Sequence, residues 1–246
     1  MGDQHLLRIC AAGLGVVILA GCGGSSSKTT SAVGGSRTPL ATSPATLRSA
    51  TPATPAQLEK IVLGTADFPA AWTGTAHQAN ASDAAWRTSF VRCLAVRDTY
   101  GDKAAEAFSQ DFTLGDAVVV SSAISYRSQS DIDTDVAAIR GPKFAPCLDQ
   151  LMKNQAAQSQ PTGTPIVASF KITPGSGGGP PNVVGTGTGT IKTGMNGKQV
   201  VHYLSFTFIT GPLLEAEVDT TNVGAPLLAS EVRSLVAAVA ARAAKG

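Results

Sequence analysis

The stretch of sequence that decides the fold is VVGTGTGTIKTGMNGKQVVHYLSFTFITGPLLEAEV, at residues 183–218. Side chains of two kinds alternate along it with a period of two, and Gly and Pro punctuate the runs. Such alternation is typical of antiparallel strands, because successive side chains point to opposite faces of a sheet. The runs with this pattern are residues 166–172, 183–192, 199–209 and 213–218. We expect them to form an antiparallel meander, with residues 195–197 as a turn.

A fifth strand and several helices flank this meander. Residues 117–126 are rich in β-branched side chains and predict the fifth strand. An Ala-rich segment at residues 226–244 carries an apolar stripe and predicts a C-terminal helix. Other expected helices are residues 55–63, 82–97, 130–140, where Ser130 would be the cap, and 144–155. The pattern predicts an α+β fold in which an antiparallel sheet of about five strands packs against helices.

Three glycines alternate with three threonines at residues 185–190. This spacing removes the side chains from one face of the strand, so another group must approach the backbone closely there. Two occupants are open at this point: the Ala-rich C-terminal helix, or a ligand in a cleft beside the sheet. The candidate cleft residues are Trp72, Gly185, Gly187, Gly189, His202, Phe206 and Phe208.

The first 22 residues have the pattern of an export signal. Arg8 lies just before an apolar run at residues 9–21, which is shorter than the ~20 residues of a spanning helix and suits a signal-peptide core. The run ends in Leu19-Ala-Gly-Cys22, which resembles the lipobox of bacterial lipoproteins. That resemblance implies cleavage after residue 21 and diacylation of Cys22, and two acyl chains anchor a protein stably. The alternative is an ordinary secretory signal with a coincidental cysteine.

Residues 22–55 predict a tether between this anchor and a folded domain. They are rich in Ser, Thr, Pro, Ala and Gly and hold no aromatic side chain, so they cannot bury enough apolar surface to order themselves. The tether carries three basic residues and no acids, and the whole chain has a formal net charge of +2. Residues 56–246 are therefore nearly neutral, which gives no electrostatic reason to expect a nucleic-acid partner. We expect this segment to be a single α+β domain.

Two cysteines remain after export, because Cys10 leaves with the signal peptide and Cys22 is lipidated. Cys93 lies on the expected helix at residues 82–97, where we expect it on the buried face, and Cys147 lies on the helix at 144–155. Disulfides persist outside the cytoplasm, so we expect these two to be bonded. The alternative is a pair of free buried thiols.

No pattern of residues indicates catalysis, a metal or a cofactor. The spacing Asp131-x-Asp133-x-Asp135 resembles the start of a calcium loop, but Val136 and Pro142 stand where that loop needs Gly and Glu. The mature chain has two histidines, His77 and His202, and no Gly-x-Ser-x-Gly motif. We expect a protein that is not an enzyme, with no catalytic residues, no metal ligands and no cofactor.

Several motifs together resemble a known group of proteins. They are the lipobox, the Thr/Pro tether, Phe68-Pro-x-x-Trp72, the cysteine helix, residues 118–126 and the segment Pro142-Lys-Phe-x-x-Cys-Leu148. The chain resembles actinobacterial, mycobacterial-type envelope lipoproteins, whose globular part is similar to the extracellular sensor domain of a mycobacterial receptor kinase. That resemblance implies an α+β fold with a central cleft, disulfide bonds and ligand binding.

These observations lead to one functional expectation and two alternatives. We expect a non-enzymatic binding or sensing module for a small or lipidic ligand, held by its lipid anchor on the extracytoplasmic face of the cell membrane. The first alternative is a structural lipoprotein that docks another envelope protein, which an exposed apolar patch would favour. The second is an unrecognised hydrolase, which would need His77 or His202 beside a nucleophile and a carboxylate.

Overall fold

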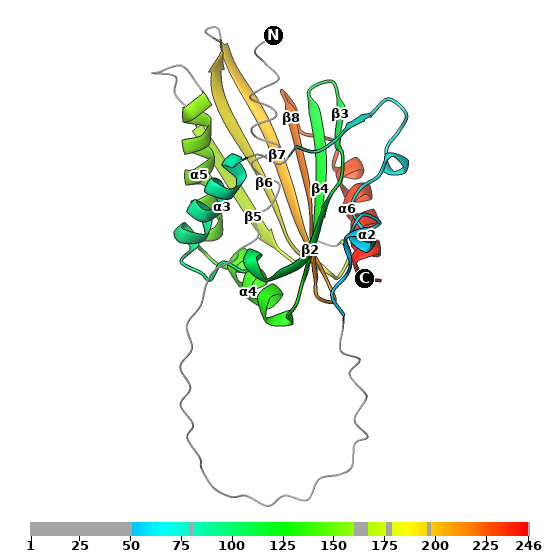
Figure 1. The fold of residues 1–246 in the computed structure, drawn as a ribbon. Coiled ribbons are helices and arrows are strands. Elements are labelled where there is room, and N and C mark those ends of the chain that lie inside the picture. The colour runs from blue at the N-terminus through cyan, green and yellow to red at the C-terminus, as the bar shows by residue number, and fades with distance from the viewer. Residues whose placement is uncertain (1–50, 79–80, 160–166, 176–178, 196–197, 246) are drawn as a thin grey trace, which may run out of the picture.

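The fold is built on one curved antiparallel sheet of eight strands (Figure 1). The structure, a computed structural model, describes residues 51–78, 81–159, 167–175, 179–195 and 198–245. The strands are β1 (Thr73–Thr75), β2 (Lys103–Phe108), β3 (Asp111–Leu114), β4 (Ala117–Tyr126), β5 (Val167–Pro174), β6 (Val183–Met195), β7 (Lys198–Gly211) and β8 (Leu214–Val223). Their order across the sheet is β1-β3-β4-β8-β7-β6-β5, and β2 pairs with β4 beside this path.

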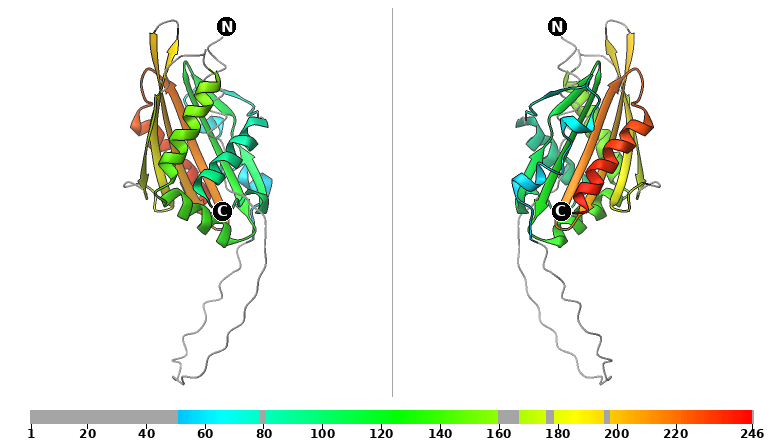
Figure 2. Two further views of the ribbon diagram at one scale, coloured as in Figure 1. Left: turned by 90° about the vertical axis from the view of Figure 1, so that its left-hand side faces the viewer. Right: turned by 90° about the vertical axis from the view of Figure 1, so that its right-hand side faces the viewer.

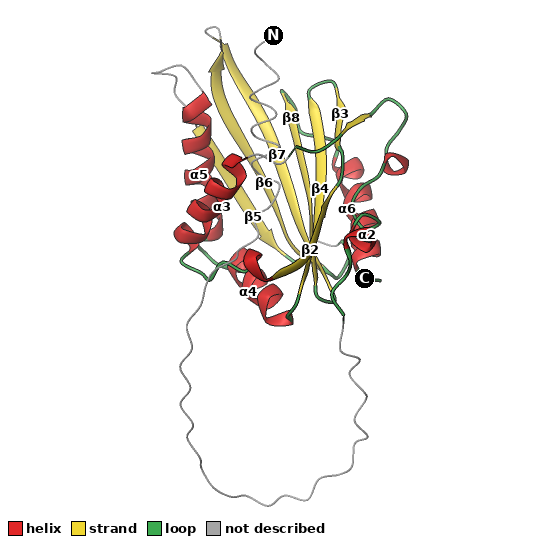
Figure 3. Cartoon of the chain, in the orientation of Figure 1, coloured by secondary structure: helices red, strands yellow, loops and turns green. Residues whose placement is uncertain are grey.

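The described residues also form five α-helices and two short 3-10 turns. These are α2 (Pro55–Leu58), η1 (Thr65–Asp67), α3 (Ala81–Leu94), η2 (Tyr100–Asp102), α4 (Gln129–Arg140), α5 (Phe144–Ser159) and α6 (Ala229–Ala243). Figure 3 shows how the helices flank the strands. The α+β class, the antiparallel sheet and the C-terminal helix are therefore confirmed.

The expected strand count was too low. All five predicted strands are present, and β4 has the predicted bounds, but β1, β2 and β3 add three more. The sequence of β2, Lys-Ala-Ala-Glu-Ala-Phe, contains no β-branched residue, so its strand conformation comes from pairing with β4 and not from local preference. The strands β1 and β3 have only three and four residues and also depend on their partners.

Helix α4 begins two residues earlier than the sequence suggested. Ser128 is its N-cap, and the Ser128 side chain accepts a hydrogen bond from the backbone N–H of Ser130 at 3.0 Å. Ser130 is thus inside the helix and does not cap it. The earlier start still leaves Asp131 in the first turn, where a carboxylate complements the helix dipole.

Helices cover both faces of the sheet (Figure 1), and the two side views in Figure 2 show α3 and α5 in front of one face and α6 in front of the other. We call the face under α2 and α6 the apolar face and the face under α3, α4 and α5 the acid face. Each face has its own large hydrophobic cluster. The sheet therefore separates two cores with different surroundings.

A disulfide joins two helices above the acid face. Cys93 of α3 and Cys147 of α5 are bonded, with their Cα atoms 5.8 Å apart, so the expected disulfide is present. Cys147 is buried, but Cys93 is exposed, which corrects the expectation that it lies on the buried face of its helix. The helix α3 turns Phe90 and Leu94 inward instead, and Cys93 reaches its partner along the helix–helix contact.

Candidate functional site

The strand β8 is buried on both sides, although its two sets of side chains differ in character. Its apolar side chains are Leu214, Ala216 and Val218. Its acidic side chains are Glu215, Glu217 and Asp219, with exposed fractions of 8%, 2% and 2%. We call these three residues the acid row. A row of three buried carboxyls on one strand is unusual, because buried acids are normally paired with cations.

In the strand register, the acid row lies between β4, which supplies small or aliphatic residues, and β7, which supplies aromatic ones. Glu217 lies opposite Ser122 of β4 and Phe208 of β7. Asp219 lies opposite Val120 of β4 and Phe206 of β7. Because β8 pairs with a strand on each side, its backbone N–H groups bond within the sheet and are not available to these carboxyls.

Several polar atoms on the acid face lack a partner. Apart from each other, the carboxyls of Glu217 and Asp219 have no hydrogen-bond partner among the described residues. The hydroxyls of Ser122 and Thr221, which are 1% and 3% exposed, also have none within the same part of the chain. A buried polar group without a partner costs about 1–3 kcal/mol. The acid face therefore holds buried hydroxyls without a partner among the described residues.

Glu217 and Asp219 interact with each other inside the acid face. Burial raises the pKa of both carboxyls well above the ordinary range, because an ionised carboxyl loses its water shell there. The charge of Asp219 raises the pKa of Glu217 further. When one of the two is protonated, it donates a hydrogen bond to the other, so the pair behaves as one coupled unit.

Glu215 forms a second coupled pair with Asp135 of α4. Burial raises the pKa of Asp135 to about 7, although hydrogen bonds from Thr99 at 2.7 Å and Tyr126 at 3.3 Å favour its ionised form. Burial and the charge of Asp135 raise the pKa of Glu215. Burial also raises the pKa of Tyr126, so this phenol stays neutral and acts as a donor. Asp135 of α4 is therefore a fourth buried acid, beside the three of the acid row.

Asp131, one turn before Asp135, is neutralised differently. It forms an ion pair with Arg97, whose other nitrogen lies 2.6 Å from Asp102. Asp133 is exposed, so the three acids of the calcium-like spacing point to different surroundings. Among the described residues, no group of three His, Cys, Asp or Glu side chains is arranged to hold a metal ion.

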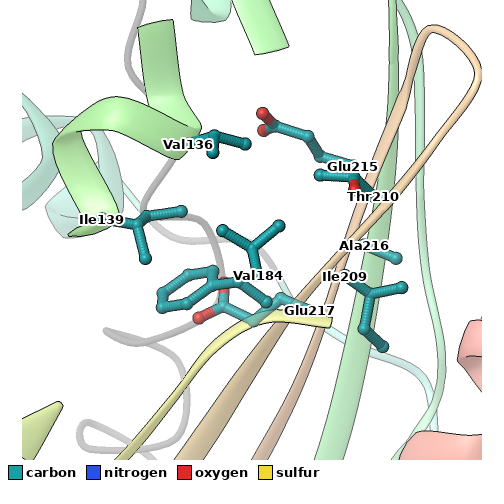
Figure 4. Close-up of a pocket in the computed structure, with 9 residues that line it drawn as sticks. Val136, Ile139, Val184, Ile209, Thr210, Glu215, Ala216 and Glu217 are labelled. Carbon is teal, nitrogen blue, oxygen red and sulfur yellow. The ribbon is translucent and has the colours of Figure 1, made fainter. Parts of the chain in front are cut away.

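A small pocket opens beside the acid row, between α4 and the strands β6, β7 and β8 (Figure 4). Its cavity volume of about 10 Å³ is close to the space of one water molecule. Most of its wall is apolar, and Glu215 and Glu217 supply the acidic part. The lining residues are Val136, Ile139, Val184, Phe208, Ile209, Thr210, Glu215, Ala216 and Glu217.

Aromatic rings lie over glycines of β6. These rings belong to the sheet itself, and not to the C-terminal helix or to a ligand, which were the two occupants expected from the sequence. A Cβ atom on Gly187 would lie 1.9 Å from the Phe206 ring, and one on Gly189 would lie 2.2 Å from the Phe170 ring. Ile139 of α4 is the nearest side chain to Gly185. The rings of neighbouring strands thus lie flat over the glycine backbone. The expectation that α6 packs there is wrong, because α6 lies on the apolar face.

The structure brings together some of the candidate cleft residues and separates others. Phe206 and Phe208 belong to the hydrophobic cluster of the acid face, and the three glycines lie beside them on β6. His202 is buried farther along β7, 3.3 Å from the Thr193 hydroxyl, and burial lowers its pKa. Trp72 packs 5.1 Å from Phe68 in the cluster of the apolar face, so it is not part of this site.

His77 is the histidine with a carboxylate partner. Its Nδ1 lies 2.7 Å from Asp111, and its ring stacks on Phe108 at 4.7 Å. In the part of the chain that the structure describes, no hydroxyl or thiol is hydrogen-bonded to either ring nitrogen of His77.

The acid row is a candidate site that the sequence analysis did not predict. The segment Glu-Ala-Glu-Val-Asp at residues 215–219 was recognised as an alternating strand, and alternation normally places the acids in solvent. One signal was present in the sequence: β4, which pairs with β8, contains no charged residue, so it offers no cation to an exposed acidic ladder.

The predictions for the N-terminus, including lipidated Cys22, concern residues 1–50, which lie outside the described residues. The predicted turn at 195–197 lies mostly outside them as well. None of the helices that the structure describes is long and apolar enough to cross a membrane. Comparison with known protein families, curated proteins and solved structures finds no match for this chain.

Proposed function

We propose that this protein is a non-enzymatic binding module, tethered by a lipidated Cys22 to the extracytoplasmic face of the cell membrane, and that its acid face captures a small or lipidic ligand. The signal-like N-terminus, the lipobox and the Ser/Thr/Pro tether support the anchored location. The resemblance to actinobacterial envelope lipoproteins and to a receptor-kinase sensor domain supports a sensing or carrier role.

One observation carries the ligand-binding part of the proposal. Two hydroxyls on the acid face, those of Ser122 and Thr221, are buried without a hydrogen-bond partner among the described residues, and the buried carboxyls of Glu217 and Asp219 have only each other. Folding should select against such groups, because each costs stability. A bound ligand that supplies the missing partners gives a physical reason for them, and the aromatic side chains beside the row suit an apolar part of that ligand.

The docking alternative has less support from the surface. Three large apolar side chains are exposed among the described residues: Leu114, Val167 and Leu228. Leu114 is on β3 and Val167 is on β5, which lie toward opposite edges of the sheet, and Leu228 precedes α6. Isolated apolar residues of this kind are ordinary on a protein surface, whereas a docking site is a contiguous patch.

Native mass spectrometry of the full-length protein, extracted gently from an actinobacterial host, tests this proposal. We expect an added mass that disappears on denaturation and an N-terminal peptide that carries acyl groups on Cys22. A Cys22→Ser variant is the control for the anchor and should lose the acyl mass while keeping the bound ligand. A bare protein mass in both variants would contradict the ligand-binding part, and an unmodified Cys22 would contradict the anchor.

A further inference from the structure

Helix α4 is joined to the sheet by a contact between two carboxyl groups. Asp135 of α4 and Glu215 of β8 are buried and hydrogen-bonded to each other. Figure 4 shows the Glu215 carboxyl pointing from β8 toward α4, beside Val136. An ionised carboxyl only accepts hydrogen bonds, so two carboxyls can bond to each other only when at least one carries a proton. This contact is therefore lost when both acids are ionised.

The groups that surround the pair are other acids and neutral donors. Thr99 and Tyr126 each donate a hydrogen bond to Asp135, at 2.7 Å and 3.3 Å. Burial raises the pKa of Tyr126, so its phenol remains neutral. The charges of Asp131 on α4 and of Glu217 on β8 interact with Glu215. A second negative charge on the pair would therefore be added to surroundings that are already acidic.

No cation is bound to the pair in the part of the chain that the structure describes, because neither acid takes part in an ion pair there. Arg97 is engaged by Asp131 and by Asp102, which lies 2.6 Å away. Lys103 is engaged by Glu106 at 2.5 Å. The residues of β6 and β7 that line the pocket beside α4 are uncharged. Full ionisation would thus leave two like charges in contact at a buried site.

The attachment of α4 differs from that of the other helices over the acid face. The Cys93–Cys147 disulfide joins α3 to α5, whereas α4 contains no cysteine. Gly141 and Pro142 separate α4 from α5, and a proline cannot continue the helix because it lacks an N–H donor. A few residues at such a junction can absorb the change in backbone angles that a moving helix requires. The chain therefore allows α4 to move while α3 and α5 stay together.

The protonation of the pair depends on whether α4 is closed. Burial raises the pKa of Asp135 to about 7, and burial and the charge of Asp135 raise the pKa of Glu215. The closed pair therefore keeps at least one proton up to about neutral pH, whereas carboxyls in water lose theirs near about pH 4. Moving α4 outward releases these protons to the solvent. A rise in pH favours the arrangement with fewer bound protons, which is the open one.

We propose that α4 is a pH-controlled lid over the acid face, closed while the Asp135–Glu215 pair holds a proton and open when both carboxyls are ionised. Val136 and Ile139 of α4 face Val184 and Phe208 across the small pocket, so opening exposes this apolar wall and the acid row beside it (Figure 4). The lid goes beyond the proposed function, because its motion does not depend on which ligand the acid face binds.

Amide hydrogen exchange, followed by mass spectrometry, tests the lid in the full-length protein in lipid nanodiscs at about pH 5 and about pH 8. Each exchange rate is divided by the intrinsic rate of an unprotected peptide at the same pH. The helix α6, on the opposite face of the sheet, is the reference within the same molecule. We expect the protection of α4 to fall by at least about tenfold more than that of α6 between the two pH values.

Two variants remove one charge from the pair and keep a hydrogen bond between its members. In Glu215→Gln and in Asp135→Asn, the new amide donates to the remaining carboxyl. Each variant should keep the protection of α4 at about pH 8 within about twofold of its value at about pH 5. Asp133→Asn is the matched control, because it changes an exposed acid of the same helix and should open like the wild type. Circular dichroism checks the folding of each variant.

Three results would overturn the lid. The protection of α4 could stay constant in the wild type, or it could fall together with that of α6, which would be a loss of global stability. Both charge-removing variants could also open like the wild type, which would mean that another group drives the motion. None of these results bears on the mass of a bound ligand, so the proposed function would stand even if the lid were disproved.

Discussion

The two faces of the sheet differ in whether their buried polar groups have hydrogen-bond partners, and β4 shows this difference within one strand. Ser121 and Ser125 point to the apolar face, where their hydroxyls accept hydrogen bonds from the backbone of Leu63 at 2.8 Å and of Ala53 at 2.7 Å. Ser122 points to the acid face and has no partner among the described residues. Serines that are equally buried therefore differ in hydrogen bonding between the two faces. The face whose buried serine has no partner is the better candidate for function.

The apolar face is closed by side chains and by α6. Arg242 of α6 binds both carboxylate oxygens of Asp67 at 2.9 Å and the carbonyl of Val62 at 3.0 Å. Gly211 lets the end of the helix approach, since a Cβ there would lie 2.3 Å from the Ala243 carbonyl oxygen. The Ala-rich helix therefore does need a glycine beside it, but at the turn between β7 and β8 and not on β6.

The largest effect is expected from a charge placed on the apolar face. Val218→Asp would put an acid without a partner into a site that is 1% exposed, on the strand that already carries Asp219 on its other side. We expect a loss of more than about 4 kcal/mol in the free energy of unfolding. Urea denaturation followed by circular dichroism measures it. A loss below about 1 kcal/mol would show that both faces of β8 tolerate acids equally.

The second-largest loss of stability is expected from removing the disulfide, and it should affect mainly the helices over the acid face. Cys93→Ser with Cys147→Ser releases α3 from α5, and the chain-entropy model gives a loss of about 4 kcal/mol for a separation of 54 residues. Amide hydrogen exchange should speed up in α3 and α5, while α6 stays protected. Reduced wild-type protein is the control and should behave like the double variant. Equal loss of protection in α6 would mean that the two faces unfold as one unit.

Replacing a glycine of β6 with alanine tests whether aromatic rings lie directly over these glycines. Gly187→Ala would collide with the Phe206 ring, and overpacking of this kind costs about 1–3 kcal/mol. Gly64→Ala is a matched control, because no atom lies within 4 Å of its added Cβ, and its effect should stay within about 0.5 kcal/mol. Thermal unfolding compares the two variants. Similar midpoints would mean that the rings do not lie over the glycines.

The smallest effect is a gain of stability. Removing one carboxyl from a crowded buried row, as in Glu217→Gln, should raise the free energy of unfolding at neutral pH by about 1 kcal/mol. Asp133→Asn changes an exposed acid of α4 and should leave stability unchanged. Denaturation at pH 7 measures both, and a clear loss of stability in Glu217→Gln would show that the carboxylate is well paired.

The same variant should also change the pH dependence. The pKa of Asp135 is raised to about 7, and those of Glu215, Glu217 and Asp219 are raised too, by burial first. Groups with a raised folded-state pKa contribute stability below their unfolded pKa of about 4 and lose it as the pH rises. We expect the wild type to lose stability from about pH 4 to pH 7 and above, and Glu217→Gln to lose less.

The sequence predicts regular elements well where the pattern is local. The bounds of β4 follow from its β-branched residues, and the meander of β5 to β8 follows from its period of two. The strand β2 does not follow from composition, because its Ala, Lys and Glu residues gain strand structure only by pairing with β4.

The candidate site was harder to predict for a related reason. The Cys93–Cys147 bond was predicted because these are the two cysteines outside the expected signal peptide and lipobox, and the Phe206–Phe208 wall follows from strand alternation. The acid row follows from neither, because its burial depends on what packs above the sheet. Alternation shows that Glu217 and Val218 face opposite ways, but it does not show that both sides are covered.

The central claim is that the acid row is buried and has no cation beside it among the described residues. Carbon-13 NMR titration of the side-chain carboxyls tests it most directly. We expect the carboxyls of Glu217 and Asp219 to titrate well above the ordinary pKa values of Glu and Asp, because burial penalises their ionised forms. Titration of both carboxyls at the ordinary values would contradict the account.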